Sequence, residues 1–343
     1  MVFIPAHRRF SLDVRWRLTP GSEAAPAWTF WLLRAQIGLV YFFGGVAKLN
    51  TDWLQGEPLR GWLGARARMP LLGPLLGQEW MVWVFAYGGL FFDLLVTPAL
   101  LWRKTRGWAL GLSVLFHLTN SFLFNIGIFP WFMLFASTLF LDPDWPHRWL
   151  RRLSGRKSDT SSSPIRAAAL QVPSSAIQRA AAMLLGAYLL LQMLIPLRHF
   201  LYPGNVSWTE EGHRFSWRMK LRSKDSEVKF FVTEKTSGRT EIVDPAGDLN
   251  RSQQDEMSSR PDMILQYAHH LAAKARLGGA TDVEVRAVVK TSLNGRAAQL
   301  LIDPSVDLAA QPRSLRAAPW IMRLTEPNRR RPERGEPQVN NQK

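Results

Sequence analysis

A lysine stands at the end of the first strongly apolar stretch of the chain, where it could act as a base. Lys48 closes the run that starts near Gly38, and Asn50, Asp52 and Trp53 follow it at once. Two roles are open for such a lysine. Its ammonium group could reach from the end of a hydrophobic helix to lipid headgroups and anchor the helix. Alternatively, partial burial could make the amine available to take up a proton.

Other polar side chains interrupt the apolar stretches. His117, Asn120 and Asn125 lie in the sequence HLTNSFLFN, and Asp93 stands inside another apolar run. Ionisable groups at membrane depth usually face protein groups and are often functional. His117 is compatible with hydrogen bonding to a quinone ring and equally with simple packing. The asparagines could line a site or hold helices together, and Asp93 fits a structural pair at least as well as catalysis.

The segment Trp208–Trp217, WTEEGHRFSW, gathers aromatic and charged side chains. It is either a loop whose tryptophans pack at a bilayer surface or a binding segment. The sequence has no GxSxG, P-loop or HExxH motif, and it has no cysteine, which excludes disulfides, thiolate metal sites and cysteine nucleophiles. His269 and His270 are adjacent and would point to different sides of a helix, so we expect no metal site.

The 343 residues divide into an apolar part and a charged part. A bilayer requires about 20 apolar residues for each helical span. Residues 54–78 are too interrupted by proline and glycine, and we predict an interfacial helix or re-entrant loop there. We predict five spans: Ala27–Val46, Trp80–Trp102, Gly107–Asn125, Ile126–Leu141 and Ile177–Leu197.

The formal charge of +16 favours contact with anionic lipid over nucleic acid, because the basic residues cluster in short loops beside apolar runs and accompany no nucleic-acid motif. If the basic N-terminus, the Arg103–Arg106 turn and the Arg148–Lys157 loop are cytoplasmic, five spans alternate without conflict. Lys48, the polar end of the third span and the chain after Arg198 then share the outer side. The expected location is a bacterial inner membrane, crossed several times.

Past residue 198 the pattern changes to that of a β-rich α+β domain. Apolar and polar residues alternate as in half-buried strands, and Asn294–Gly295 is a strong hairpin signal. The predicted strands are Arg214–Arg222, Glu227–Thr233, Thr240–Val243, Asp282–Val289 and Ala297–Ile302, and the predicted helix is Pro261–Lys274.

The predicted fold is therefore a membrane α-helical bundle followed by a β-rich extracytoplasmic domain. The predicted parts are a basic cytoplasmic segment 1–26, a transmembrane domain 27–197 with a polar loop 142–177, an extracytoplasmic domain 198–324 and a disordered tail 325–343.

Five stretches of the chain carry a family resemblance: Ala6–Phe10, Leu32–Trp53, Phe116–Phe140, Trp208–Leu221 and Leu301–Ala309. Taken together and in this order, they resemble the vitamin K-dependent γ-glutamyl carboxylases and their bacterial relatives. The resemblance covers about residues 6–325. It implies a carbon–carbon lyase that couples oxidation of a reduced naphthoquinone (reduced vitamin K) by O2, with epoxidation, to carboxylation of peptidyl glutamate with CO2.

The resemblance also implies residue roles. Lys48 falls on the family's base, which takes a proton from the hydroquinone where water is excluded. The family segment that Trp208–Trp217 resembles is implicated in glutamate and quinone handling. The expected cofactor-binding residues are His117, Asn120, Trp208 and Trp217, and the expected substrate-binding residues are His213 and Arg214.

The chain departs from the family pattern in three respects. Animal enzymes carry apolar and tyrosyl residues where Gly212 and His213 stand here, and they have paired cysteines that this sequence lacks. Full-length members have further spans before the block that Ala6–Phe10 resembles, so we expect this chain to lack N-terminal spans. Two alternatives stay open: a relative that oxidises quinol without carboxylating glutamate, and a truncated, non-catalytic membrane binding protein.

Overall fold

The computed structural model describes residues 12–16, 27–124, 126–153 and 176–325. The chain forms two compact units. Unit 1 comprises Met1–Val46 and Tyr87–Ile195, and unit 2 comprises Ala47–Ala86 and Pro196–Lys343. Residues 47–86 therefore pack with the C-terminal region, although the predicted transmembrane domain includes them. The resemblance block Ala6–Phe10, Asn125 and the predicted disordered segments (154–175 of the loop and 326–343) lie outside the described residues.

Four helical stretches in the described part of the chain are long and apolar enough to cross a membrane. They agree with four of the five predicted spans to within a few residues, because length and apolarity alone define such helices. The stretches are α2 (Ala27–Lys48), α6 (Glu79–Leu101), α7 (Arg106–Phe124) and Arg179–Leu201, which is built from α10 (Ala176–Leu194) and the 3-10 helix η3 (Ile195–Leu201).

The predicted span Ile126–Leu141 is a shorter helix. It consists of α8 (Phe129–Ser137) and the 3-10 helix η2 (Thr138–Phe140). Gly127 has a φ of +64° and Pro130 lies in the first turn of α8, so the helix begins only at Phe129. Twelve helical residues reach about 18 Å, well short of the roughly 30 Å hydrocarbon core. The number of crossings therefore stays a prediction.

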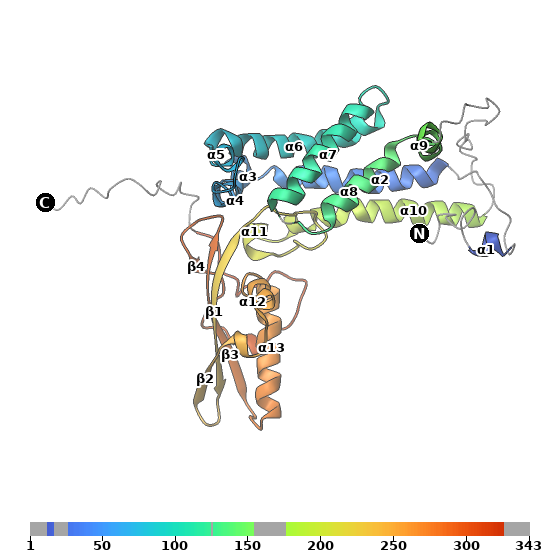
Figure 1. The fold of residues 1–343 in the computed structure, drawn as a ribbon. Helices are drawn as coiled ribbons and strands as arrows, with labels where there is room; N and C mark the ends of the chain where they lie inside the picture. Colours follow the sequence, from blue (N-terminus) through green and yellow to red (C-terminus); the bar gives the residue numbers. More distant parts are fainter. Residues whose placement is uncertain (1–11, 17–26, 125, 154–175, 326–343) are drawn as a thin grey trace. The chain divides into compact units, whose positions relative to one another are not determined.

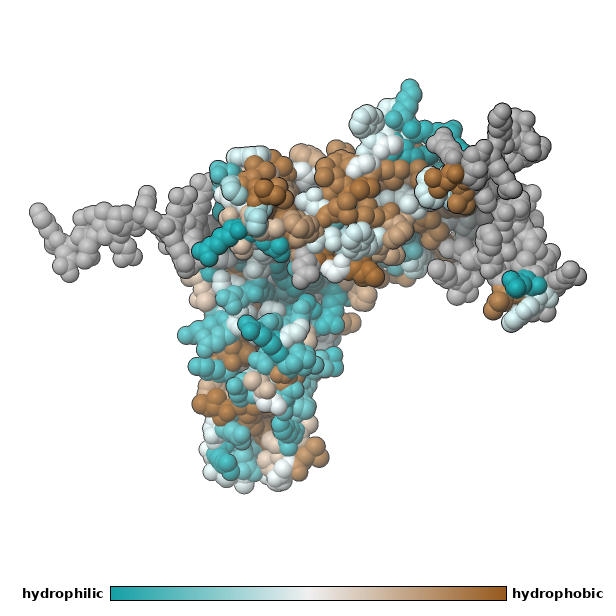
Figure 2. All heavy atoms as spheres, viewed as in Figure 1, coloured by the Kyte–Doolittle hydropathy of each residue, from teal (hydrophilic) through white to brown (hydrophobic). Residues whose placement is uncertain are grey.

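Unit 1 packs its helices through small residues and aromatic side chains. A Cβ on Gly45 of α2 would lie 2.6 Å from Leu94 of α6, and one on Gly38 would lie 3.0 Å from Thr97. Such positions let helix backbones approach closely. Brown, hydrophobic spheres gather over the surface of these helices in Figure 2, as expected of helices surrounded by lipid.

Unit 2 contains a four-stranded antiparallel sheet in the order β2-β1-β3-β4. The long strand β3 alternates buried and more accessible residues along its whole length, as a strand with one core-facing side must. Two helices, α12 and α13, accompany the sheet (Figure 1). The elements are β1 (Lys224–Glu234), β2 (Arg239–Val243), β3 (Val283–Leu293), β4 (Gln299–Leu300), α12 (Arg251–Ser258) and α13 (Pro261–Leu277).

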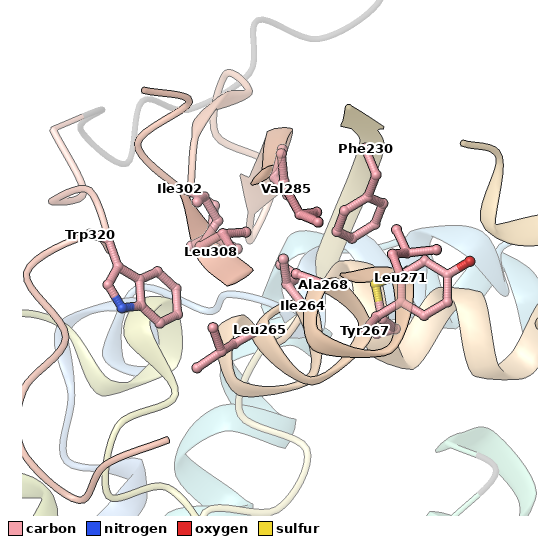
Figure 3. Packing of buried hydrophobic residues seen from close by; sticks show 14 of the residues in the cluster. Phe230, Ile264, Leu265, Tyr267, Ala268, Leu271, Val285, Ile302, Leu308 and Trp320 are labelled. Atoms are coloured by element: carbon pink, nitrogen blue, oxygen red, sulfur yellow. The ribbon is translucent and has the colours of Figure 1, made fainter. Parts of the chain in front are cut away.

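The core of unit 2 lies between the sheet and α13. Ile264, Ala268 and Leu271, at helical spacing along α13, pack in one cluster with Phe230 and Val285 from the sheet (Figure 3). These five side chains are almost completely buried. Their spacing of three and four residues on the helix and of two on β3 is the pattern that predicted this part of the fold.

Most of the predicted strands are confirmed, and one is wrong. The stretches Glu227–Thr233, Thr240–Val243 and Asp282–Val289 are parts of β1, β2 and β3, whereas Ala297–Ile302 yields only the two residues of β4. The chain turns at Asn294 and Gly295, both with positive φ, as predicted. The helix Pro261–Lys274 is confirmed and extends to Leu277.

The predicted strand Arg214–Arg222 is a series of turns. Phe215, Trp217 and Lys220 have φ values of +61°, +56° and +49°, which no β-strand contains. The alternation of apolar and polar residues does not mark a buried face here. The turns bury Ser216, Arg218 and Leu221 and leave the apolar side chains of Phe215 and Met219 exposed.

The remaining helices of the described chain are short. Residues 54–78, the predicted interfacial segment, contain α4 and α5, and their place relative to a bilayer stays a prediction. The short helices are α1 (Leu12–Arg15), α3 (Thr51–Leu54), α4 (Leu59–Ala65), α5 (Gly73–Leu76), α9 (Trp145–Leu153), α11 (Val206–Thr209), η4 (Pro245–Gly247) and η5 (Leu308–Ala310).

Candidate functional site

Lys48 is the last residue of α2 and is buried, with only 9% of its surface exposed. Its Nζ atom lies 5.3 Å from the ring centroid of Trp53, within cation–π range. Two hydrogen bonds fix that ring: Trp53 N donates to Asn50 Oδ1 at 3.1 Å, and the indole N–H donates to Ala86 O at 2.8 Å. An anchoring lysine would extend its ammonium group away from the protein, whereas this side chain packs against it. The role of Lys48 as a base stays a prediction.

Asp52, next to Trp53 in α3, forms a buried ion pair within unit 2. Its carboxylate accepts two hydrogen bonds from Arg296, at 2.6 and 2.9 Å, and one from Asn294 Nδ2 at 2.7 Å. Both side chains of the ion pair are 7% exposed. The pair connects the turn after Lys48 to the hairpin between β3 and β4. Nothing in the sequence pattern singles out Arg296.

The candidate substrate segment begins at α11 and then turns sharply. Asn205 caps α11 by accepting a hydrogen bond from Ser207 N at 2.8 Å. Glu210 and Gly212 have φ values of +61° and +68°. A Cβ on Gly212 would lie 2.6 Å from the Cα of His199, closer than any real contact. This position therefore requires glycine in this chain.

The two tryptophans of the segment lie in different environments. Trp208 is completely buried in the core of unit 2, and its Nε1 donates to Met322 O at 2.7 Å. Trp217 is half-buried in a left-handed turn. Of the two predicted cofactor-binding tryptophans, Trp208 is thus placed as a core residue, and Trp217 is more accessible to a ligand.

Glu210 is the acidic centre of a buried charged cluster. Its carboxylate accepts hydrogen bonds from Arg222 Nε and, at 2.9 Å, from Lys224 Nζ. Lys224 also donates to Trp208 O at 2.7 Å and Ser259 O at 2.9 Å. Burial lowers the pKa of Lys224 to about 8, while the neighbouring Glu210 acts in the opposite direction.

His213 is a neutral member of this cluster. Burial, followed by the charges of Arg222 and Arg218, lowers its pKa to about 3. Its Nε2 lies 2.6 Å from Arg222 Nη1. Because a guanidinium can only donate, Nε2 must be the acceptor and the neutral ring carries its proton on Nδ1.

Arg218 is the least satisfied cation of the cluster. The residue is only 8% exposed, and its buried Nε atom has no hydrogen-bond partner among the described residues. Burial and Arg222 lower its pKa to about 10, so it is charged at pH 7. The cluster therefore holds Arg218, Arg222 and Lys224 around the single carboxylate of Glu210. Such an excess of buried positive charge suits a carboxylate ligand.

Arg214, predicted to bind substrate, is exposed and pairs with Asp262 at 2.6 Å. The sequence pattern did not single out Arg218 or Arg222, because both lay in a stretch predicted to be an ordinary strand. A buried arginine whose Nε has no hydrogen-bond partner becomes apparent only once the turns are known.

The remaining candidates belong to unit 1. His117 is buried in α7, and its Nε2 lies 2.8 Å from Tyr41 Oη, which in turn lies 3.2 Å from Ser137 Oγ. This network leaves Nδ1 of the ring for another partner. Phe92 and Phe116 stack with centroids 3.9 Å apart beside the imidazole.

Asn120 follows His117 by three residues and is half-buried, one helical turn further along α7. Asp93 is buried against α2, where a Cβ on Gly44 would come within 3.1 Å of its Oδ2. Unit 1 thus places hydrogen-bonding groups beside aromatic side chains.

The predicted site residues fall into the two units as follows: His117 and Asn120 belong to unit 1, and Lys48, Trp208, His213, Arg214 and Trp217 belong to unit 2. No group of three histidine, aspartate or glutamate side chains that could hold a metal ion occurs in the part of the chain that the structure describes.

Two family models match the chain. The model of the HTTM domain matches residues 1–145. The model described as "Vitamin K-dependent gamma-carboxylase, lumenal domain" matches residues 177–327, which include the charged cluster and the sheet of unit 2. No solved structure matches the chain.

Proposed function

Because the chain is a relative of the vitamin K-dependent γ-carboxylase family, we propose that it couples oxidation of a reduced naphthoquinone to carboxylation of peptidyl glutamate. It is a membrane protein with a C-terminal domain of the family's lumenal type. Lys48 is the proposed base, and O2 and CO2 are the proposed co-substrates.

The observation that carries this proposal is the buried guanidinium of Arg218. The carboxylate of a glutamate side chain would add negative charge beside this guanidinium, whose buried Nε has no hydrogen-bond partner among the described residues, and Arg222 and Lys224 add positive charge nearby. Hydrogen bonds between charged partners contribute about 1.5–3 kcal/mol each. A site with this charge favours an acidic side chain over its amide.

Lys48 has the surroundings that the proposed role needs. The buried amine lies beside the Trp53 ring, where little water competes for it. In this role Nζ accepts a phenolic proton, and Trp53 holds the resulting ammonium by a cation–π contact. Asp52 and Arg296 fix the turn in which Trp53 lies.

The residues of unit 1 fit a quinone ring. Nδ1 of His117 offers a hydrogen bond, Phe92 and Phe116 offer aromatic faces, and Asn120 adds an amide one turn away. When bound, the hydroquinone supplies the reducing power with which O2 is activated for removal of the glutamate γ-proton. Trp217 is proposed to border the bound ligand, and His213 is proposed to orient Arg222.

A second candidate function is quinol oxidation without carboxylation. It is favoured by Gly212 and His213, since the animal enzymes have larger apolar and tyrosyl side chains at these positions. A non-catalytic binding protein is the third candidate, and it predicts no turnover of any kind.

The test is turnover of reduced vitamin K by the full chain in lipid nanodiscs, with wild type, Lys48→Ala and Lys48→Arg. A general base contributes about 100- to 10,000-fold, so we expect at least a 100-fold loss of epoxide in both variants. Arginine keeps the positive charge and the cation–π contact but cannot accept a proton at neutral pH. Activity in Lys48→Arg would support the anchor role instead.

Incorporation of labelled CO2 into a glutamate peptide separates the candidates. Epoxide with labelled peptide supports the carboxylase. Epoxide without label supports quinol oxidation alone, and the absence of both supports a binding protein. Equal epoxide formation by wild type and Lys48→Ala would remove Lys48 from the mechanism.

A further inference from the structure

Unit 2 contains a groove of about 580 Å³ beside the candidate substrate segment. One wall is formed by residues 198–214, and the other by residues 311–321. Leu265 and Trp320 give it an apolar floor that continues into the core, where both side chains are visible in Figure 3. Its volume is in the range of protein ligand sites, which is about 300–1,000 Å³. We call it the arginine groove, after Arg198, Arg214, Arg313 and Arg316 in its lining.

Hydrogen bonds between the two walls fix the shape of the groove. Tyr202 Oη donates to Leu315 O at 2.6 Å, and the carboxylate of Glu211 accepts from Ala318 N at 2.7 Å. Burial raises the pKa of Glu211, while the bond from Ala318 acts in the opposite direction. A groove fixed in this way loses little conformational entropy when a ligand binds.

The charges that line the groove do not balance. All three carboxylates are already engaged: Glu210 by Arg222 and Lys224, Glu211 by Ala318 N, and Asp262 by Arg214. Arg313 and Arg316 are exposed, and neither makes an ion pair with any residue that the structure describes. Their charges are therefore available to an anionic partner.

We propose that the arginine groove binds an acidic peptide segment that flanks the residue held at Arg218. This rests on the proposed function, and it adds a second contact for the same substrate. Carboxylates of the segment pair with Arg313 and Arg316, and its aliphatic groups cover the exposed Leu315 in the same lining. Glu210 connects the two places, since it lines the groove and also bonds to Arg222 of the cluster.

An acidic peptide fits the groove better than a lipid headgroup or free phosphate. Small anions would engage the arginines but would leave the apolar part of the lining, including the exposed Leu315, in water. An extended peptide places alternate side chains on opposite sides, so acidic and aliphatic groups can reach the rim and the floor together.

The test is fluorescence anisotropy with the full chain in nanodiscs of neutral lipid and without quinone. The probe is a labelled ten-residue peptide of alternating Glu and Leu, and the control peptide has Gln in place of Glu. We expect the Glu peptide to bind at least tenfold more tightly, and high salt to remove the difference. The double variant Arg313→Ser/Arg316→Ser should lose at least tenfold, whereas Arg239→Ser, on the exposed strand β2, should bind as wild type does.

Equal binding of the Glu and Gln peptides, or unchanged binding by the double variant, would overturn the proposal. So would a double variant that keeps peptide binding but no longer associates with anionic vesicles, since that result assigns the arginines to lipid. Failure here is distinguishable from failure of the proposed function. If the peptide binds but neither epoxide nor labelled peptide forms, only the proposed enzymatic activity is rejected. If carboxylation occurs but the double variant binds the peptide as wild type does, only the proposed role of the arginine groove is rejected.

Discussion

Asp52 and Arg296, 244 positions apart in the sequence, form a buried bidentate ion pair within unit 2. Asn294 completes the hydrogen bonding of the carboxylate and also accepts from Ser223 N at 2.8 Å. The hairpin turn of the sheet thereby holds the turn that carries Trp53, the ring beside Lys48. The position of the proposed base depends on residues at the far end of the sequence.

Removing the charge of Asp52 should destabilise unit 2 strongly. Asp52→Asn leaves the Arg296 guanidinium buried without a counter-charge, which costs about 3–5 kcal/mol of unfolding free energy. The measurement is denaturant unfolding in detergent, followed by tryptophan fluorescence. Asp262→Asn is the matched control, because its pair with Arg214 is exposed and such pairs contribute about 0–1 kcal/mol. Similar losses in both variants would contradict a special role for the buried pair.

Gly212→Ala should destabilise the protein through a steric clash as well as backbone strain. A left-handed conformation costs a non-glycine residue about 1–3 kcal/mol, and the added Cβ would meet the His199 backbone at 2.6 Å. Gly238→Ala is the control, since Gly238 has a similar φ of +70° with nothing within 4 Å. Thermal unfolding of both variants isolates the clash. An equal loss of melting temperature would show that His199 moves aside freely.

The stability of unit 2 should fall as the pH drops below about 6.5. His213 has a pKa of about 3 in the folded protein, against about 6.5 when unfolded. Between these values only the unfolded state takes up the proton, so unfolding becomes more favourable by at most about 1.4 kcal/mol per pH unit. His213→Gln keeps an acceptor for Arg222 and removes the titration.

The measurement is the unfolding midpoint of wild type and His213→Gln from pH 7.5 to 4.5. The difference between the two proteins isolates His213 from carboxylates such as Glu211. Parallel curves for the two proteins over this range would contradict the buried, neutral state of this histidine.

Arg218→Met should weaken use of a glutamate peptide more than it affects quinol oxidation. Loss of a charged hydrogen bond of about 1.5–3 kcal/mol corresponds to a 10- to 150-fold rise in KM for the peptide. Epoxide formation without peptide should change by less than threefold. Arg218→Lys should recover only part of the loss, because lysine lacks the planar guanidinium. Peptide KM equal to that of wild type in Arg218→Met would remove the cluster from the substrate site.

The sequence predicts the apolar helices and the core strands well, because each depends on a local pattern. Length and apolarity are enough for α2, α6 and α7, and the strict alternation of β3 reflects one buried face. The predicted span Ile126–Leu141 has the apolarity but not the helix length, since the helix begins only at Phe129, after Gly127 and next to Pro130.

Local patterns mislead where tertiary packing imposes the backbone. The segment Arg214–Arg222 alternates like a strand, yet Phe215, Trp217 and Lys220 adopt left-handed conformations. These conformations are unfavourable in isolation and persist only because burial of their neighbours compensates for them.

The candidate site is predictable only in part for the same reason. Lys48 and Trp208–Trp217 stand out by residue type and position, and their roles stay predictions. Arg296 and Arg218 do not stand out, because a partner far away in the sequence, or the lack of a partner, is a property of the folded chain alone.

The packing of Ala47–Ala86 with Pro196–Lys343 has a consequence for exchanging parts between relatives. A hybrid joined only at residue 196 would combine Asp52 of one protein with the hairpin of another. Unless the second parent also has an arginine and an asparagine at the matching places, the carboxylate would be buried with no counterpart. Residues 47–86 should therefore be exchanged together with the C-terminal region, and substitutions at 52, 294 and 296 should occur together among homologues.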